Sequence, residues 1–260
     1  MYNEYLEFAK TIAYKAKDIM LKYFDKDSNF NYKSDNTIVT VADKEINHYL
    51  IEEVRKKYPN HSVDGEEEQI GSSDYVWICD PIDGTAMYAR GIPTCVFSLA
   101  LSIKGEVVAG LVYDPFNDNM YYASKGNGAY KNDKKIMVNN YTLDDKESLV
   151  HYDMHPSFDY DVYDVIKELG KRTYIVSIGS IIRACMCIAE GNFNLAIFPG
   201  TIHKNCDIAA VKIIVEEAGG MVTDLFGKDQ RYDKDINGAI ISNGIIHDEV
   251  IKLVKDKIIK

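Results

Sequence analysis

The segment WICDPIDGT, residues 77–85, places two carboxylates directly after a short apolar run. The run Tyr75–Cys79 predicts a buried strand, and Pro81 fixes the backbone between Asp80 and Asp83. Carboxylates at the end of a buried strand are costly to hold as isolated anions, whereas a divalent cation would neutralise them. A solvated turn is the ordinary alternative for a single Asp-Pro dipeptide. The full pattern of a strand followed by two acids favours a metal site.

The Gly84-Thr85 pair opens a turn or short helix after these acids, and its backbone N–H groups would suit a phosphate. The spacing also argues against one class of phosphatase. Haloacid-dehalogenase-like enzymes carry D-x-D-G-T after a strand and use the first Asp as a nucleophile. Here Pro81 occupies that position, two residues before Asp83, so an aspartyl-phosphate route through this motif is not expected.

Further acidic residues lie at the predicted ends of other elements. They are Glu66 and Glu67 in VDGEEE (63–68), Asp43 in TVAD (40–43) and Asp207 in CDIAA (206–210). Each has an ordinary explanation: an acidic run is usually a solvated loop, and Asp43 and Asp207 would serve as N-caps of the helices that follow. Two acidic clusters that lie next to the same sheet and close to each other can also share one metal site.

The charge of the chain limits the classes of partner. The 260 residues carry a formal net charge of -10, which disfavours nucleic acid and anionic membranes as main partners. A small anionic substrate is compatible with this charge, because bound metal ions can outweigh it locally. No segment approaches the roughly 18 consecutive apolar residues of a membrane span, and Glu4, Glu7 and Lys10 interrupt any secretory signal. Five cysteines without a CxxC motif indicate reduced thiols, so we expect a cytoplasmic protein.

The hydrophobic spacing predicts two halves, residues 1–147 and 148–260, that form one compact unit. Most of the candidate metal ligands fall in the first half. The first half should contain helices at 1–24 and 43–59, strands at 75–79, 95–103, 106–113 and 120–124, a hairpin turn at Lys104-Gly105, and loops at 25–36 and 126–147. The second half should alternate helices at 158–169, 180–190, 207–218 and 246–258 with strands at 173–177, 193–198, 220–224 and 239–242.

Taken in order, the motifs G-E-E (65–67), D-P-I-D-G-T (80–85) and D-I-A-A…E-A-G-G (207–220) resemble those of the inositol monophosphatase family. Lys33, the TVAD segment and Gly179-Ser180 extend the resemblance over nearly the whole chain. The family comprises magnesium-dependent, lithium-sensitive phosphatases of small phosphate monoesters. The resemblance implies an α+β or α/β fold, the layered αβαβα sandwich of the inositol monophosphatase and fructose bisphosphatase type.

The resemblance also implies a set of Mg²⁺ ligands. Glu66, Asp80 and the backbone carbonyl of Ile82 should hold one ion, and Asp80, Asp83 and Asp207 should hold a second. Such ions lower the pKa of the attacking water and neutralise charge on the transferring and leaving oxygens.

A third, weaker ion is implied near Glu66 and Glu67. The Thr85 hydroxyl, paired with Asp43, should orient the attacking water together with Glu66, and no covalent enzyme intermediate is expected. The residues implied to receive the phosphate are Asp83, Gly84, Thr85, Gly179 and Ser180.

The chain departs from the family pattern around its last metal ligand. Cys206 precedes that Asp where many members carry Trp, and the stretch FPGTIHKN (198–205) has no acid where inositol-hydrolysing members commonly carry Glu. We hypothesise that Arg183, His203 or Lys204 recognises a second anionic group on the substrate. The alternative is that all three are solvated surface residues.

The implied substrate is a small phosphorylated metabolite. Inositol 1-phosphate leads, because YDPF (113–116) looks like the inositol branch. Histidinol phosphate is an alternative, because that branch has a V-T-x-A-D segment like residues 39–43, and fructose 1,6-bisphosphate or 3′-phosphoadenosine 5′-phosphate would supply a second anion. A role of another class is that of some bacterial relatives, which act as transcription accessory proteins that bind RNA polymerase. Family members are usually homodimers, so we expect a homodimer.

Overall fold

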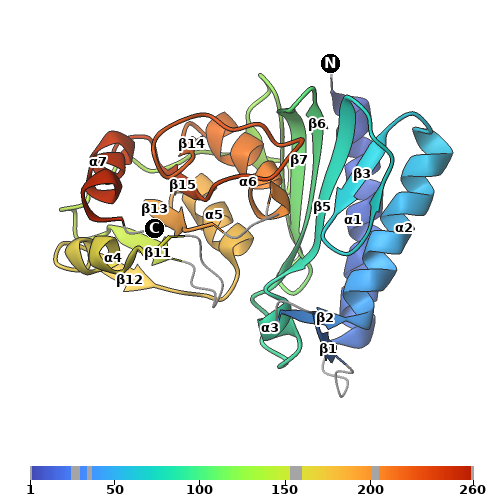
Figure 1. Cartoon of the computed structure of the whole chain (residues 1–260), viewed down its shortest axis with the longest axis horizontal. Coiled ribbons are helices and arrows are strands. Elements are labelled where there is room, and N and C mark those ends of the chain that lie inside the picture. Colours follow the sequence, from blue (N-terminus) through green and yellow to red (C-terminus); the bar gives the residue numbers. More distant parts are fainter. Residues whose placement is uncertain (1, 25–29, 34–36, 153–159, 201–204, 259–260) are drawn as a thin grey trace.

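The predicted strand at 75–79 belongs to β5 (Tyr75–Asp83), an inner strand of an eight-stranded sheet in the computed structural model (Figure 1). The structure describes residues 2–24, 30–33, 37–152, 160–200 and 205–258. The described strands of this first sheet follow the order β10-β9-β8-β7-β6-β5-β3-β4; β3 pairs parallel with β5, and the other neighbours pair antiparallel. The other strands of this sheet are β3 (Ser62–Gly65), β4 (Gln69–Ile70), β6 (Val96–Ile103), β7 (Glu106–Asp114), β8 (Asn119–Ser124), β9 (Ala129–Lys131) and β10 (Lys134–Ile136).

A second sheet is built from the later part of the chain. Its five strands follow the order β12-β11-β13-β15-β14, with β11 parallel to both β12 and β13. The pairs β13–β15 and β15–β14 are antiparallel. The strands are β11 (Leu149–Tyr152), β12 (Tyr174–Val176), β13 (Leu195–Phe198), β14 (Met221–Thr223) and β15 (Ala239–Ser242).

Helices cover both sheets and separate them, which confirms the αβαβα sandwich (Figure 1). The first pair, α1 and α2, packs on one face of the first sheet, and α5 and α6 lie between the two sheets. The last pair, α4 and α7, pack together against the outer side of the second sheet. These helices are α1 (Asn3–Tyr23), α2 (Val41–Lys57), α4 (Tyr163–Leu169), α5 (Ile181–Ala189), α6 (Asn205–Glu217) and α7 (His247–Lys257).

The small residues of the D-I-A-A motif allow α6 to lie close to the first sheet. Ala209 and Ala210 are buried on this helix, opposite Gly110 of β7. A Cβ atom at Gly110 would lie 2.5 Å from Cγ2 of Ile213 and 3.1 Å from Cα of Ala210. The motif therefore has a packing role, and this close approach holds α6 on the first sheet.

Two short pairs of strands form where the sequence predicts loops. Residues 30–32, expected to be loop, form β1 (Phe30–Tyr32), which pairs with β2 (Ile38–Thr40). Residues 129–131 and 134–136, also expected to be loop, form the small edge hairpin β9–β10. Each of these strands has only three residues, too few for a hydrophobic period, so it is defined by its pairing partner.

Several other predictions are confirmed. The apolar stripe of α1 is buried, and the β6–β7 turn lies at Lys104-Gly105, where both residues have positive φ values of 54° and 88°. Such values are typical of a tight hairpin turn. In the described part of the chain, no helix has the length and apolarity to cross a membrane.

Candidate metal and phosphate site

Two of the predicted ligands, Glu66 and Asp80, lie next to each other because β3 and β5 run parallel. This is the only parallel pair among the described strands of the first sheet. Gly65 of β3 is the register partner of Cys79 of β5, and the N–H of Glu66 donates to the carbonyl of Cys79 at 3.1 Å. Glu66 therefore continues the ladder next to Asp80, at the carboxyl ends of two parallel strands. Asp80 is 2% exposed.

The acidic turn after β3 already holds one positive charge. The ammonium of Lys33 lies 3.2 Å from Oε1 of Glu66 and 2.5 Å from Oε1 of Glu67. Burial opposes the charge of Lys33, but the attraction of Glu66 and the hydrogen bond to Glu67 outweigh it, and the pKa of Lys33 is raised. The turn therefore favours a cation at the position where the resemblance implies the third ion.

The sequence reasoning missed Asn47, which fixes this acidic turn. Its amide accepts from the N–H of Glu67 at 3.2 Å and donates to the carbonyl of Glu68 at 3.1 Å. Asn47 lies on the buried face of α2 between the apolar residues Ile46 and Leu50. A polar residue next to an apolar stripe was the signal that could have found it.

Asp43 does not cap α2 as predicted. The N-cap is Thr40, and Asp43 is the third helical residue of a capping box. Its Oδ2 accepts from the N–H of Thr40 at 2.7 Å and from the Thr40 hydroxyl at 2.6 Å. Among the described residues its buried Oδ1 has no hydrogen-bond partner. Burial raises the pKa of Asp43 to about 7, against the lowering effect of the bonds from Thr40.

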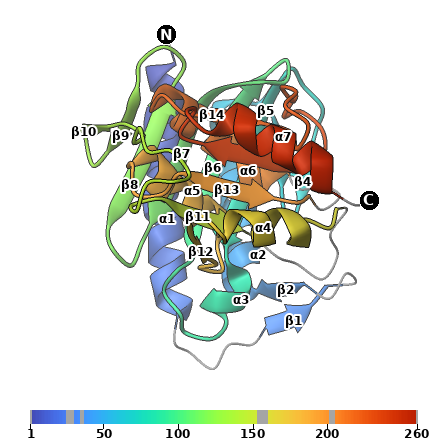
Figure 2. The same cartoon turned by 90° about the vertical axis from the view of Figure 1, so that its left-hand side faces the viewer.

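The structure shows no hydrogen bond between Thr85 and Asp43, so their predicted pairing around the attacking water stays a prediction. The Thr85 hydroxyl donates instead to the carbonyl of Ile82 at 2.8 Å. Thr85 begins the short helix α3 (Thr85–Tyr88), which packs beside β2 at one end of the molecule (Figures 1 and 2). Asp43 lies in the first turn of α2, the helix that follows β2. The two residues therefore lie on neighbouring segments, and no hydrogen bond joins them.

The strand β5 does not end at Cys79 as expected but continues through both carboxylates. Asp80 pairs with Ser98 and Asp83 with Val96, so three steps along β5 match two along β6. Residues three apart on a regular strand point to opposite faces, and the extra residue of such a bulge re-aims the side chains that follow it. Oδ1 of Asp80 also accepts from the N–H of Ile82 at 3.0 Å, which fixes the turn between the acids.

Asp83 joins the first sheet to the helix layer between the sheets. Its Oδ2 accepts from the Ser180 hydroxyl and, at 2.8 Å, from the N–H of Ile182 in the first turn of α5. Ser180 is the N-cap of that helix. The two segments predicted to receive the phosphate, 83–85 and 179–180, are thus in direct contact.

Gly84 makes this contact possible. Its φ is +86°, and a Cβ atom there would lie 2.9 Å from the carbonyl oxygen of Gly179 and 3.3 Å from Cβ of Ser180. A side chain at Gly84 would therefore be strained by its backbone conformation and would push the two segments apart.

Asp207 lies in the first turn of α6, which packs against β5, and is 7% exposed. The start of α6 is tied to the first sheet by Asn205, whose amide donates to Oδ2 of Asp64 at 2.8 Å and to the carbonyl of Tyr232 at 3.0 Å. Asn205 is a second positioning residue that sequence reasoning missed, because its partners are far away in the chain.

The chemistry of these donors suits Mg²⁺, which prefers carboxylate and carbonyl oxygens. Asp80, Asp83 and Asp207 are all buried, although carboxylates are rarely buried without compensation. As positioned, however, no three His, Cys, Asp or Glu side chains among the described residues converge in the way a bound ion requires. The ligand set thus stays a prediction, supported by the location and chemistry of its members.

Of the residues hypothesised to bind a second anion, only Arg183 lies in the described chain; His203 and Lys204 fall outside it. The alternative that Arg183 is a solvated surface residue is wrong. Its Nε lies 3.3 Å from Oδ2 of Asp114, and its Nη1 donates to Sγ of Cys187 at 3.1 Å. These contacts direct its guanidinium into the protein, and its contact with a second anionic group of the substrate stays a prediction.

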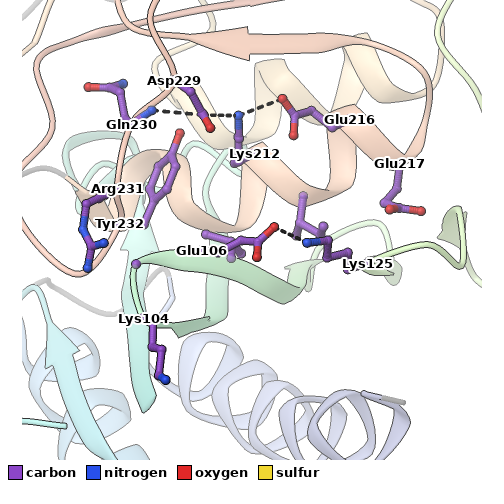
Figure 3. Close-up of a pocket in the computed structure, with 13 residues that line it drawn as sticks. Lys104, Glu106, Lys125, Lys212, Glu216, Glu217, Asp229, Gln230, Arg231 and Tyr232 are labelled. Carbon is purple, nitrogen blue, oxygen red and sulfur yellow. Dashed lines mark hydrogen bonds and ion pairs between the residues drawn. The ribbon is translucent and has the colours of Figure 1, made fainter. Parts of the chain in front are cut away.

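A pocket of about 410 Å³ elsewhere on the molecule has no predicted site residue in its lining (Figure 3). It lies between the β6–β7 turn and α6. Its most enclosed cation, Lys212, is 2.8 Å from Oε1 of Glu216 and 2.7 Å from Oδ1 of Asp229, and it donates to the carbonyl of Val222 at 3.0 Å. The charge of Lys212 is thus already neutralised within the protein.

Comparisons with known proteins agree with the fold and the motifs. Residues 1–258 match the family model described as the inositol monophosphatase family. The chain is 34% identical to the fructose-1,6-bisphosphatase/inositol-1-monophosphatase of Thermotoga maritima over 96% of each chain. It is 31% identical to the Nus factor SuhB of Pasteurella multocida over 86% of each. A solved IMPase structure from Thermotoga maritima superposes with a TM-score of 0.86 at 32% identity, covering 97% of both chains.

Proposed function

The chain belongs to the inositol monophosphatase family, and on that premise we propose that it is a Mg²⁺-dependent hydrolase whose substrate is inositol 1-phosphate. Hydrolysis of a phosphate monoester is the activity that the family and the relatives support. The observation that carries the proposal is the contact between residues 83–85 and 179–180. This contact lies at the end of β5, whose neighbour β3 leads into the acidic turn of Glu66.

Glu66, Asp80 and the carbonyl of Ile82 would hold one Mg²⁺, and Asp80, Asp83 and Asp207 a second. When bound, these ions supply Lewis-acid activation of water and neutralise charge on the phosphate oxygens. The Thr85 hydroxyl donates to the carbonyl of Ile82 and so fixes the direction of that ligand. A third ion near Glu66 and Glu67 would compete with the ammonium of Lys33 for the same carboxylates.

The remaining residues would bind and orient the reacting groups. The N–H groups of Gly84 and Thr85, with the Gly179-Ser180 segment beside them, would receive the phosphate. Asp43 would orient the attacking water by accepting a hydrogen bond from it at Oδ1, since Oδ2 of Asp43 already accepts from Thr40. Binding both the water and the phosphate on fixed segments supplies the proximity that hydrolysis requires.

The choice of substrate separates several alternatives. Fructose 1,6-bisphosphate is favoured as a second substrate by the name of the Thermotoga relative, which includes both activities. Histidinol phosphate and 3′-phosphoadenosine 5′-phosphate are further alternatives. Phosphate release from these four esters, measured at equal concentration with Mg²⁺ and with chelator, tests the proposal. We expect the highest kcat/KM for inositol 1-phosphate, and a higher value for any other ester would replace it as the proposed substrate.

A second function is favoured by the relative named Nus factor SuhB. In that case the chain would also bind RNA polymerase as a transcription accessory protein. Capture of RNA polymerase by the purified chain, compared with an Asp80→Asn variant that retains the surface, would separate binding from catalysis. We further propose a homodimer in the cytoplasm; sedimentation of the purified chain tests the dimer, and cell fractionation tests the location.

A further inference from the structure

The first turn of α5 is held by an ion pair that reaches across to the first sheet. Arg183 lies in this turn, and its Nε is 3.3 Å from Oδ2 of Asp114, the last residue of β7. Asp114 is 2% exposed and the Arg183 side chain 21% exposed. An ion pair sheltered to this degree is screened much less by solvent than a surface pair.

Asp114 is a rigid anchor for this pair. Its Oδ1 accepts from the N–H groups of Phe116 and Asn117, both at 3.1 Å, and its Oδ2 accepts from the side-chain amide of Asn117 at 2.8 Å. The carboxylate is therefore fixed by the turn that follows β7. A guanidinium placed against it is held in one position relative to the first sheet.

The same helical turn holds the carboxylate of Asp83. The Ser180 hydroxyl and the N–H of Ile182 both donate to Oδ2 of Asp83, so the orientation of this carboxylate depends on where α5 begins. Arg183 is the next residue along, and its own N–H donates to Oγ of Ser180 at 3.1 Å. A displacement of Arg183 would move both donors to Asp83.

We propose that Arg183 is a positioning residue: its ion pair with Asp114 fixes the first turn of α5 on the first sheet and thereby orients the Asp83 carboxylate for metal binding. The metal-binding part rests on the proposed function, whereas the orientation of Asp83 does not. The residue thus acts through Ser180 and Ile182.

The other end of α5 supplies a matched control. Glu190, the C-cap residue, accepts from Lys131 at 2.6 Å and from the hydroxyl of Tyr121, so a second cation ties the helix to the same sheet. The Lys131 side chain is 27% exposed, close to the value for Arg183. Oε1 of Glu190 also lies 4.0 Å from Nη1 of Arg183, so Lys131→Met leaves Glu190 paired with Arg183 and the Arg183–Asp114 ion pair intact. It removes a comparable tie at the end of α5 away from Asp83.

The experiment compares Arg183→Met, Asp114→Asn, Arg183→Lys and Lys131→Met with the wild type in two measurements that need no substrate. The first is Mg²⁺ binding by titration calorimetry, and the second is hydrogen exchange of the Ile182 amide in the metal-free protein. We expect Arg183→Met and Asp114→Asn to weaken Mg²⁺ binding by about ten- to a hundredfold, the usual effect of losing a partner that orients a metal ligand. Both variants should also speed exchange at Ile182, Arg183→Lys should restore part of each loss, and Lys131→Met should change neither.

Equal effects of Arg183→Met and Lys131→Met would overturn the proposal, because they would indicate a general loosening of α5. Unchanged exchange at Ile182 in Arg183→Met would overturn it as well. If the wild type binds Mg²⁺ but hydrolyses none of the four esters, the proposed function fails while both measurements still test the positioning role. If the wild type binds no Mg²⁺, the proposed function fails and the exchange at Ile182 alone decides whether Arg183 positions Asp83.

Discussion

Replacing Gly84 by alanine tests the contact on which the phosphate site depends. The backbone at Gly84 has a φ of +86°, and such a conformation costs an L-residue with a Cβ atom about 1–2 kcal/mol. The new methyl group would also lie 2.9 Å from the Gly179 carbonyl oxygen, a backbone atom that cannot rotate away. Forcing an extra carbon into a packed site costs about 1–3 kcal/mol. The two effects together predict a loss of about 2–5 kcal/mol in the free energy of unfolding.

Gly126 provides the control for the backbone effect. Its φ of +78° is similar, but no heavy atom lies within 4 Å of the position where a Cβ would be built. Gly126→Ala should therefore lose only the conformational part, about 1–2 kcal/mol. Urea unfolding of both variants measures the difference, which we expect to be about 1–3 kcal/mol.

The same pair of variants separates stability from activity. In Gly84→Ala the Gly179-Ser180 segment should move away from residues 83–85, and the misplacement should lower kcat by about ten- to a hundredfold. Gly126→Ala should retain the kcat of the wild type under conditions in which both proteins are folded. Equal losses of stability in the two variants, or an unchanged kcat in Gly84→Ala, would refute the close approach of the two segments.

Three further predictions concern single residues near the site and in the second sheet. Asn47→Ala should lower the free energy of unfolding in urea by about 1–3 kcal/mol, because it leaves the N–H of Glu67 without its acceptor. A loss below about 0.5 kcal/mol, which is the usual scatter of surface substitutions, would contradict this role. Asp43→Asn should lower kcat with little loss of stability, and an unchanged kcat would exclude Asp43 from catalysis. His151 is fully buried, and burial lowers its pKa from 6.5 to about 4, so its neutral form is favoured in the folded state. Its contribution to stability is therefore complete above pH 6.5 and is lost as the pH falls towards 4. His151→Leu should remove about 3 kcal/mol of this pH dependence, and parallel unfolding curves for variant and wild type across that range would contradict it.

The sequence predicted best where the hydrophobic pattern is strong and local. The apolar stripe of α1 and the positive-φ turn at Lys104-Gly105 are both local signals, and both are confirmed. The D-P-I-D-G-T segment was correctly associated with a buried strand, although β5 continues to Asp83. The bulge that permits this continuation depends on pairing with β6, which a local pattern does not reveal.

The predictions failed where a residue's role depends on a distant partner. β1 consists of Phe30, Asn31 and Tyr32, and three residues are too few to show a periodicity, so the strand is defined only by its pairing with β2. The ion pair of Arg183 with Asp114 is not visible in the sequence, because Asp114 lies 69 positions before it. Thr40 was overlooked as a cap because Asp43, in the same four-residue segment, is an equally good capping residue.

The most direct test of metal-dependent hydrolysis at this site is phosphate release from inositol 1-phosphate by the wild type and by Asp80→Asn, each with Mg²⁺ and with chelator. Asp80 is buried beside Glu66 and is the residue shared by both proposed ions. We predict Mg²⁺-dependent release by the wild type, no release with chelator, and a loss of at least about a thousandfold in Asp80→Asn, which corresponds to roughly 4 kcal/mol in the activation free energy. Undiminished release by Asp80→Asn, or release that is insensitive to chelator, would contradict this assignment of the site.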